Sequence, residues 1–431
     1  MKILKKLSVL LLTGFLMLSC NQKSNTVTSQ KDYNKYLEIK DNKSRDFVQG
    51  EINFWEKKFD DAPNQILYLG LLASNYSKLF ENTGNVKYLY KAEELLLKSN
   101  ENYKYSVVGT IRSLSRNYIS QHRFQEALVL ANKALAIGEG KKETQKLLFD
   151  INMELGNYTQ AEQNLTAIKD SADFDYLIRI SKWNDHLGDL ETAISLMEKA
   201  KDIAILNNNK YLQIWTYSNL GDLNGHAGNV KKSYDYYLKT LEMEPNNSYA
   251  LKGIAWIAFS HERNTVEAKR IIDKISKRHP TPDFYLLKVQ IAEFENNTVA
   301  KNKNLTAYFQ MLDSINYGAM YNKYNALIYA DDKKTATKAL EIAQIEVAHR
   351  PTPDSYALLA WSYYNLGDSK KALEIAEKYV VGKSFEPQLN YHLAAIYKAN
   401  NITAKIAPMK EELVNSIYEL GPNMEQKISN L

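Results

Sequence analysis

Small side chains return along this chain at nearly constant intervals, and this recurrence restricts the possible folds more than any other feature. Each lies in a stretch whose apolar residues follow the spacing of one helical face. The intervals are 32 to 40 residues, apart from one of 71 that spans two units. The recurring residues are Ala92, Ala127, Ala161, Ala193, Ser233, Ala268, Ala339 and Ala372. Because small residues let two helices cross closely, the sequence predicts a series of stacked helix hairpins.

The unit at residues 355–380 shows the pattern most clearly. Ala360 lies among larger apolar residues on one helical face, and Ala372 does so in a second helical stretch. Between them, Gly367 can adopt the positive φ that ends a helix, and Asp368 can cap the helix that follows. A hairpin of this size cannot bury its own apolar face, so it requires copies of itself on either side.

This order of bulky, small and turn-forming residues resembles the tetratricopeptide repeat (TPR), whose period is about 34 residues. The resemblance implies an all-α, right-handed α-solenoid of about ten TPR-like hairpins over residues 65–405. It also implies an N-terminal capping helix at 46–64 and a C-terminal capping helix and tail at 406–431, since terminal repeats must cover an exposed core. A solenoid grows by adding repeats, so a chain of 431 residues need not divide into several globular domains.

The first residues have the form of a secretory leader. Basic residues precede an apolar run that ends at Leu18, which predicts a signal peptide at 1–19. The segment Met17–Cys20 resembles a bacterial lipobox, although that motif normally has Leu where Met17 stands. The resemblance implies cleavage before Cys20 and lipid on its thiol, and the polar residues that follow predict a flexible tether over the rest of 20–45. The alternative is an ordinary signal peptide with an incidental cysteine.

The residues after Cys20 bear on localisation. Asn21 stands where an Asp often directs such lipoproteins to the inner membrane, so we expect the outer membrane. No acidic run of the kind found in some surface-exported lipoproteins follows, which favours the periplasmic face. The sequence therefore predicts a lipid-anchored protein of the bacterial cell envelope, in contact with the membrane through its anchor only.

Charge and cysteine content exclude several classes of protein. The formal net charge is +5, but Lys2, Lys5 and Lys6 lie in the leader, and from Cys20 onward 52 basic side chains face 50 acidic ones. This balance does not favour nucleic-acid binding. Cys20 is the only cysteine, so neither a disulfide framework nor a cysteine metal site is expected.

No motif in the chain indicates catalysis. The sequence contains no HExxH, GxSxG, GxxxxGK[ST] or GxGxxG. None of the seven histidines has a second histidine three or four positions away, as a helical metal site would require. We therefore expect no enzymatic activity, no cofactor and no metal ion.

Solenoids of this kind bind through their concave face, which the first helix of each hairpin lines. Residues one turn away from the packing face predict a groove with a basic N-terminal half and an aromatic C-terminal half, suited to an extended acidic peptide. The alternative is that the tryptophans belong to inter-repeat cores and the charges are ordinary solvated residues. The candidate groove residues are Arg112, Arg116, Lys146, Arg179, Lys182, Trp215, Asn219, Trp256, Trp361 and Tyr364.

Two inter-repeat loops are near copies, Arg278–Asp283 and His349–Asp354. Each offers Thr as an N-cap followed by Pro at the first helical position, which predicts helix capping; an anion site is the alternative.

As a whole the sequence favours a membrane-anchored scaffold for protein partners. The alternative is a lipoprotein that captures glycan or peptide substrates for an outer-membrane transporter, although the long insertions typical of such receptors are absent.

Overall fold

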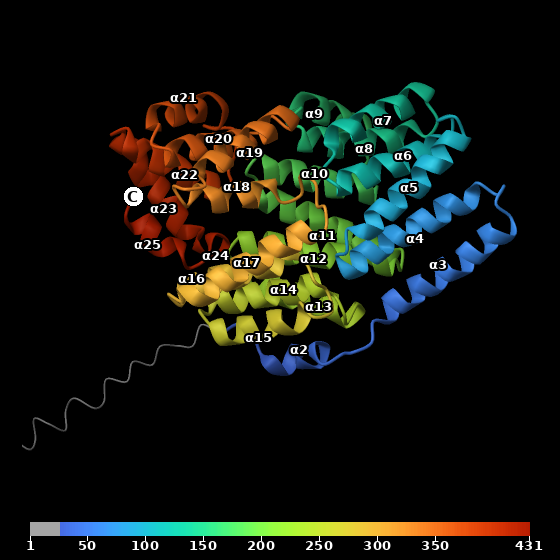
Figure 1. The fold of residues 1–431 in the computed structure, drawn as a ribbon, viewed down its shortest axis with the longest axis horizontal. Coiled ribbons are helices and arrows are strands. Elements are labelled where there is room, and N and C mark those ends of the chain that lie inside the picture. Colours follow the sequence, from blue (N-terminus) through green and yellow to red (C-terminus); the bar gives the residue numbers. More distant parts are fainter. Residues whose placement is uncertain (1–25) are drawn as a thin grey trace, which may run out of the picture.

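The computed structural model describes residues 26–431, and every regular element in this range is a helix (Figure 1). The predicted signal peptide and Cys20 lie outside the described residues. Within that range, ten helix hairpins follow two N-terminal helices, and most consecutive hairpins stack on one another. The prediction of an all-α solenoid of about ten TPR-like hairpins is confirmed.

The helices are numbered in chain order. The N-terminal helices are α2 (Gln30–Leu37) and α3 (Lys43–Asp61). The hairpins are α4 (Leu67–Thr83) with α5 (Lys87–Asn102), α6 (Val108–Ser120) with α7 (Phe124–Ile137), α8 (Lys141–Glu154) with α9 (Tyr158–Ala167), α10 (Phe174–His186) with α11 (Leu190–Leu206), α12 (Lys210–His226) with α13 (Val230–Met243), α14 (Ser248–Trp256) with α15 (Thr265–Ile275), α16 (Pro282–Phe294) with α17 (Thr298–Ser314), α18 (Asn322–Ala330) with α19 (Ala336–His349), α20 (Pro353–Asn365) with α21 (Ser369–Tyr379), and α22 (Pro387–Ala399) with α23 (Ile406–Asn415).

Short elements complete the chain. A π-helical turn, η1 (Ile257–His261), extends α14, and a 3₁₀ turn, η2 (Thr403–Lys405), precedes α23. Two short helices, α24 (Ile417–Leu420) and α25 (Met424–Ser429), end the chain. Because α23 packs against α22 as the second helix of a hairpin, the solenoid extends past the predicted boundary at residue 405.

The recurring small residues lie where the two helices of a hairpin meet. Each of the eight is fully buried, with no exposed surface. In two hairpins a serine of the first helix shows how close the approach is. Ser115 Oγ donates to the carbonyl of Ala127 at 2.9 Å, and Ser181 Oγ donates to that of Ala193 at 2.7 Å. A larger side chain at these positions would push the paired backbones apart.

The turn at residues 367–368 has the predicted geometry. Gly367 adopts a φ of 91°, in the left-handed region that favours glycine. The Asp368 carboxylate accepts a hydrogen bond from the N–H of Lys371 at 2.9 Å and so caps α21. In the two similar loops, proline stands at the first position of α16 and of α20, as predicted. Thr352 accepts a hydrogen bond from the Ser355 N–H, whereas Thr281 forms no such cap.

The segment after residue 26 is not the flexible tether that its polar composition suggested. We call residues 26–41 the N-terminal strap, because they cross the outer side of α13, η1 and α15. The N–H groups of Val27 and Thr28 both donate to the Glu262 carboxylate, at 2.7 and 2.6 Å. The tether prediction is therefore wrong for the described part of 20–45.

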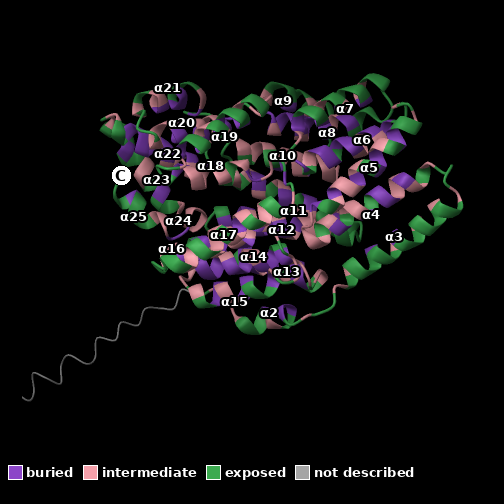
Figure 2. Ribbon diagram, in the orientation of Figure 1, coloured by how far each residue is buried: buried purple, intermediate pink, exposed green. Residues whose placement is uncertain are grey.

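An apolar stripe on α2 explains the position of the strap. Tyr33, Tyr36 and Leu37 follow helical spacing and lie in one apolar cluster with α13, α14 and α15. Tyr33 is fully buried, and its hydroxyl donates to Glu267 at 2.6 Å. Farther along, α3 buries Val48 and Ile52 against α4 and leaves its opposite face exposed (Figure 2).

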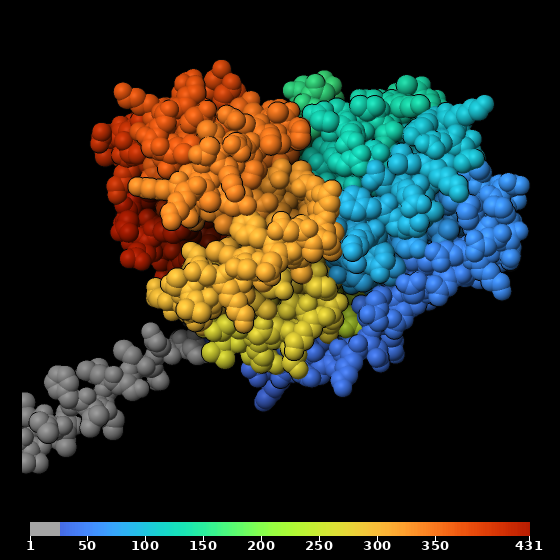
Figure 3. All heavy atoms as spheres, viewed as in Figure 1, coloured from blue at the N-terminus to red at the C-terminus, as the bar shows by residue number. Residues whose placement is uncertain are grey.

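Hairpin turns also meet loops from distant repeats. His279 Nδ1 lies 3.3 Å from the Asn82 carbonyl, a contact between residues 197 apart in the sequence. A Cβ at Gly84 would lie 2.3 Å from the Thr281 side chain, and one at Gly156 would lie 3.1 Å from the carbonyl of Pro351. Both similar loops thus dock on earlier hairpin turns, and helices from the two halves of the chain touch in the space-filling view (Figure 3). The solenoid therefore curves far enough to contact itself and encloses an interior.

Candidate interior binding surface

Most of the predicted basic groove residues form ion pairs with carboxylates of the same chain. Lys146 is only 5% exposed, and its Nζ lies 2.7 Å from Asp175. Arg179 pairs with Asp150 at 2.6 Å and also donates to the Lys146 carbonyl. These contacts link α8 to α10. Because both cations already pair with carboxylates of the chain, they are not free to bind the carboxylate of a peptide.

Of the other three basic candidates, only Lys182 also pairs with a carboxylate within residues 26–431. Lys182 lies 3.0 Å from Glu154, and Arg112 donates to the carbonyls of Glu139 and Gly140. Arg116 is exposed, yet surrounding protein and the charges of Arg112 and Arg179 hold the pKa of its guanidinium below the usual value. Carboxylates of the chain itself thus neutralise three of the five predicted basic groove residues.

The aromatic candidates separate into core and cavity residues. Trp361 is 8% exposed and stacks on Tyr364 and His392, with ring centroids 4.8 and 4.1 Å away, so it packs between repeats and is not available to a partner. Tyr364 packs in the same cluster. Trp215 and Trp256, by contrast, line the interior of the solenoid. Asn219 lies with Trp215, and its side-chain amide donates to the Trp215 carbonyl at 2.8 Å.

Three adjoining cavities form the interior. The central cavity, of about 430 Å³, lies between α12, α14, α16, α18 and α24. It shares Tyr249, Lys252 and Asp283 with a cavity of about 750 Å³ toward the N-terminal repeats. It shares His226 and Glu419 with a third, of about 410 Å³, which also touches the predicted residue Lys182. The shared residues make these cavities one continuous interior surface.

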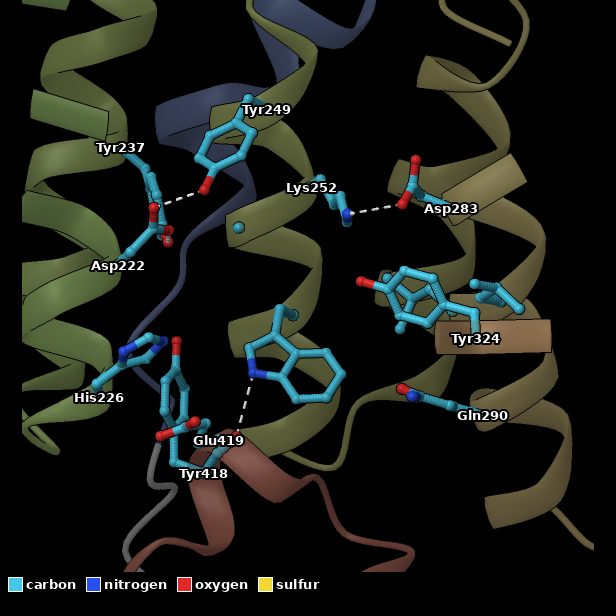
Figure 4. A pocket seen from close by; sticks show the side chains of 14 residues that line it. Asp222, His226, Tyr237, Tyr249, Lys252, Asp283, Gln290, Tyr324, Tyr418 and Glu419 are labelled. Carbon is cyan, nitrogen blue, oxygen red and sulfur yellow. Dashed lines mark hydrogen bonds and ion pairs between the residues drawn. The ribbon is translucent and has the colours of Figure 1, made fainter. Parts of the chain in front are cut away.

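Two glycines shape one wall of the central cavity. A Cβ at Gly221 or at Gly253 would lie within 2.5 Å of the Tyr237 ring, so their absence of a side chain lets this ring insert between α12 and α14. The Tyr237 hydroxyl then donates to Asp222 at 2.6 Å, and the Tyr249 hydroxyl donates to the same carboxylate at 2.5 Å (Figure 4). The two phenols thus hold the Asp222 side chain in place, although burial raises its pKa.

The wall below Asp222 in Figure 4 comes from α24. The Trp256 indole donates to the Tyr418 carbonyl at 3.1 Å, and Ser260 donates to the same oxygen. These bonds place Glu419 beside His226 at the junction of the central and third cavities (Figure 4). A ring from α18, Tyr324, faces the cavity from the far side.

Carboxylates gather around His226. The set consists of Asp185, Asp222, Glu386 and Glu419. Burial raises the pKa of each, and the positive form of His226 lowers it only in part. Repulsion from Glu419 and Asp354 raises the pKa of Glu386 further. Within residues 26–431, none of the four forms an ion pair with a lysine or arginine.

Sequence reasoning did not identify this carboxylate group. Glu386 and Glu419 come from the last repeats and share no periodic pattern with Asp185 or Asp222. The pair Gly221–Asp222 looks like the turn pair at 367–368, yet it lies inside α12. The one usable signal was the position of Trp256, which was predicted to face the concave side and does line the central cavity.

Other possible sites are absent from the part of the chain that is described. No three histidine, aspartate or glutamate side chains in residues 26–431 are arranged to hold a metal ion. Among the helices of the same range, none combines the length and the apolar character needed to cross a bilayer.

Taken together, the stacked hairpins and enclosed interior define an α-solenoid of TPR-like repeats. Residues 354–381 match the family model described as tetratricopeptide repeat, and they form the hairpin of α20 and α21. A comparison with curated proteins finds no match to this chain.

Several solved structures have a similar fold. A structure of human IFIT1, a dimer with m7Gppp-AAAA, is 12% identical, with a TM-score of 0.49 over 77% of this chain and 76% of that one. Pseudomonas aeruginosa PilF is 17% identical, with a TM-score of 0.36 over 49% of this chain and 92% of its own. A tetratricopeptide repeat protein from Parabacteroides merdae is 18% identical, with a TM-score of 0.39 over 55% and 93% of the two chains. These similarities carry no statement about the function of this chain.

Proposed function

We propose that this protein is a membrane-anchored scaffold of the bacterial cell envelope that holds an extended segment of a protein partner inside its solenoid. The observation that carries the proposal is the continuous interior surface formed by three adjoining cavities. Helices from repeats far apart in the chain supply its walls, with aromatic rings beside polar groups. Such a surface offers both the low-entropy contact area and the directional hydrogen bonds that recognition of a peptide requires.

Anchoring through Cys20 is the second part of the proposal. Its support is the apolar run and the lipobox-like segment that end at this residue. The strap adds a geometric consequence, because its hydrogen bonds hold Val27 against Glu262. An extended chain advances about 3.5 Å per residue, so Val27 lies at most about 25 Å from Cys20. A lipid on Cys20 would therefore keep the side of the solenoid that carries η1 and α15 close to the membrane.

Lipid labelling tests the anchor. The wild-type protein is expected to incorporate a labelled fatty acid and to sediment with outer membranes, whereas Cys20→Ala is expected to incorporate none and to leave the membrane fraction. Protease added to intact cells is expected to spare the protein if it faces the periplasm. Incorporation that persists in Cys20→Ala would refute the anchor.

Crosslinking in intact cells tests the scaffold. A photoreactive amino acid at Tyr324, which faces the central cavity, is expected to crosslink to a defined partner. The same amino acid at Phe47, which is 70% exposed on α3, serves as a surface control. Mass spectrometry of the crosslinked peptides identifies the partner segment. Identical products from both positions, or none from Tyr324, would contradict binding in the interior.

A further inference from the structure

The carboxylates around His226 differ from others at the interior in having no ion-pair partner in the described part of the chain. Elsewhere, several carboxylates that approach the interior are matched by cations, as Glu154 is by Lys182 and Asp150 is by Arg179. Around His226, four carboxylates converge from α10, α12, the loop before α22, and α24, and none of them has a lysine or arginine partner within residues 26–431. We call Asp185, Asp222, Glu386 and Glu419 the inner carboxylates.

The inner carboxylates line the interior cavities, so their charges act on anything that binds there. Asp185 and Glu386 have exposed side chains, so the interior solvent reaches them, yet the protein around them disfavours ionisation and raises their pKa values. Like charges placed together in this way repel one another and attract a cation. The charge of His226 acts on all four. Lys182, Lys252 and Lys323 also lower individual pKa values in this set, but each of these lysines forms its ion pair with another carboxylate.

The walls beside the inner carboxylates are aromatic. Trp256, Tyr324 and Tyr418 line the central cavity together with Asp222 and Glu419 (Figure 4). An aromatic face attracts a lysine ammonium or an arginine guanidinium, and it also packs against the apolar stem of either side chain. Carboxylates and rings in one cavity therefore favour a cationic side chain over an acidic or neutral one.

We propose that the interior of the solenoid receives a lysine- or arginine-containing segment of its protein partner, with a basic side chain between the inner carboxylates and the rings of the central cavity. This inference rests on the proposed scaffold function and specifies the chemistry of its partner. It replaces the acidic peptide expected from the sequence, because three of the five basic residues on which that expectation depended, Lys146, Arg179 and Lys182, are already paired with carboxylates inside the chain.

Peptide binding to the full-length lipidated protein in detergent tests the inference. The probes are short fluorescein-labelled peptides in which alanine alternates with lysine, arginine, glutamine or glutamate, and anisotropy reports binding. The lysine and arginine peptides are expected to bind at least tenfold more tightly than the glutamine peptide, and more weakly as salt is added. The glutamate peptide is expected not to bind. Equal affinity for the lysine and glutamine peptides would overturn the inference.

Matched variants distinguish an effect of the inner carboxylates on binding from an effect of the net charge of the protein. Asp185→Asn, Glu386→Gln and Glu419→Gln together are expected to weaken binding of the lysine peptide by roughly tenfold or more, because the charges that attract the ammonium group are removed. The control combines Asp60→Asn, Glu341→Gln and Glu411→Gln, which remove three exposed carboxylates outside the cavities. The control is expected to bind as the wild type does. An equal loss of affinity in both triple variants would show that net charge alone causes the effect, and it would overturn the inference.

Further measurements distinguish a failure of this inference from a failure of the proposed scaffold function. Circular dichroism verifies that each variant is folded, and the three single variants replace the triple one if it is not. Binding of spermidine without binding of either basic peptide would exclude a protein segment as the occupant. If crosslinking at Tyr324 captures a partner equally in the wild type and in the triple variant of the inner carboxylates, the scaffold function stands and the basic segment is refuted. If the basic peptides bind but no partner is captured, the scaffold function fails instead.

Discussion

Replacement of Tyr33 by alanine tests whether the N-terminal strap is a structural part of the fold. Tyr33 is fully buried among helices α13 to α15, and its hydroxyl donates to Glu267. An aromatic side chain buries about 150–250 Å². At about 25 cal/mol per Å² this area corresponds to ~4–6 kcal/mol, an upper value because the unfolded chain already buries part of it. We therefore expect Tyr33→Ala to lower the free energy of unfolding by about 3–5 kcal/mol.

Urea unfolding of the purified full-length protein, followed by tryptophan fluorescence and by circular dichroism, measures this loss. Both signals are needed because a long repeat array need not unfold in a single step. Phe47→Ala provides the control, since this ring is 70% exposed on α3 and its removal is expected to cost less than about 1 kcal/mol. Tyr33→Phe retains the ring and loses only the hydrogen bond, at about 1–2 kcal/mol. Equal midpoints for Tyr33→Ala and Phe47→Ala would refute the strap and restore the flexible tether.

Three other sets of substitutions report on the packing and the charges of the solenoid. Ala193→Leu overfills a fully buried helix crossing and is expected to cost about 1–3 kcal/mol of stability in thermal unfolding. Arg179→Ala leaves Asp150 without its partner and is expected to lower stability in urea by about 1–3 kcal/mol, contrary to a role confined to partner binding. For Asp185, Glu386 and Glu419, burial raises the folded-state pKa above the unfolded value, so ionisation opposes folding at neutral pH. Their amide replacements are expected to raise the melting temperature at pH 7 but not below about pH 4, where these carboxyls are protonated even in the unfolded chain.

Local sequence patterns were sufficient for the repeating unit. The small residues at Ala127 and Ala193, the left-handed Gly367 and the capping Asp368 all lie where their spacing predicts. Each of these features acts within one hairpin or between neighbouring helices. Their effect depends on a few residues near one another in the chain, which is why composition and period reveal them.

The sequence analysis missed the strap because the polar composition of the same segment indicated a flexible tether. Residues 22–31 are polar, and this composition favours a tether after a lipidated cysteine. The stripe of Tyr33, Tyr36 and Leu37 is short, and the surface that it covers belongs to repeats more than 200 residues later, as the contact of Tyr33 with Glu267 shows. A stripe of three residues does not reveal its partner.

The sequence by itself determined that this chain forms about ten stacked helix hairpins, because the period of small and apolar residues specifies contacts between neighbours. Only the tertiary structure decided that the hairpin turn at Asn82 meets the loop at His279, and that Glu386 and Glu419 join Asp185 and Asp222 around His226. The physical reason is that the curvature of a solenoid is the sum of small rotations at every interface between repeats. No single interface encodes which distant residues this sum brings together.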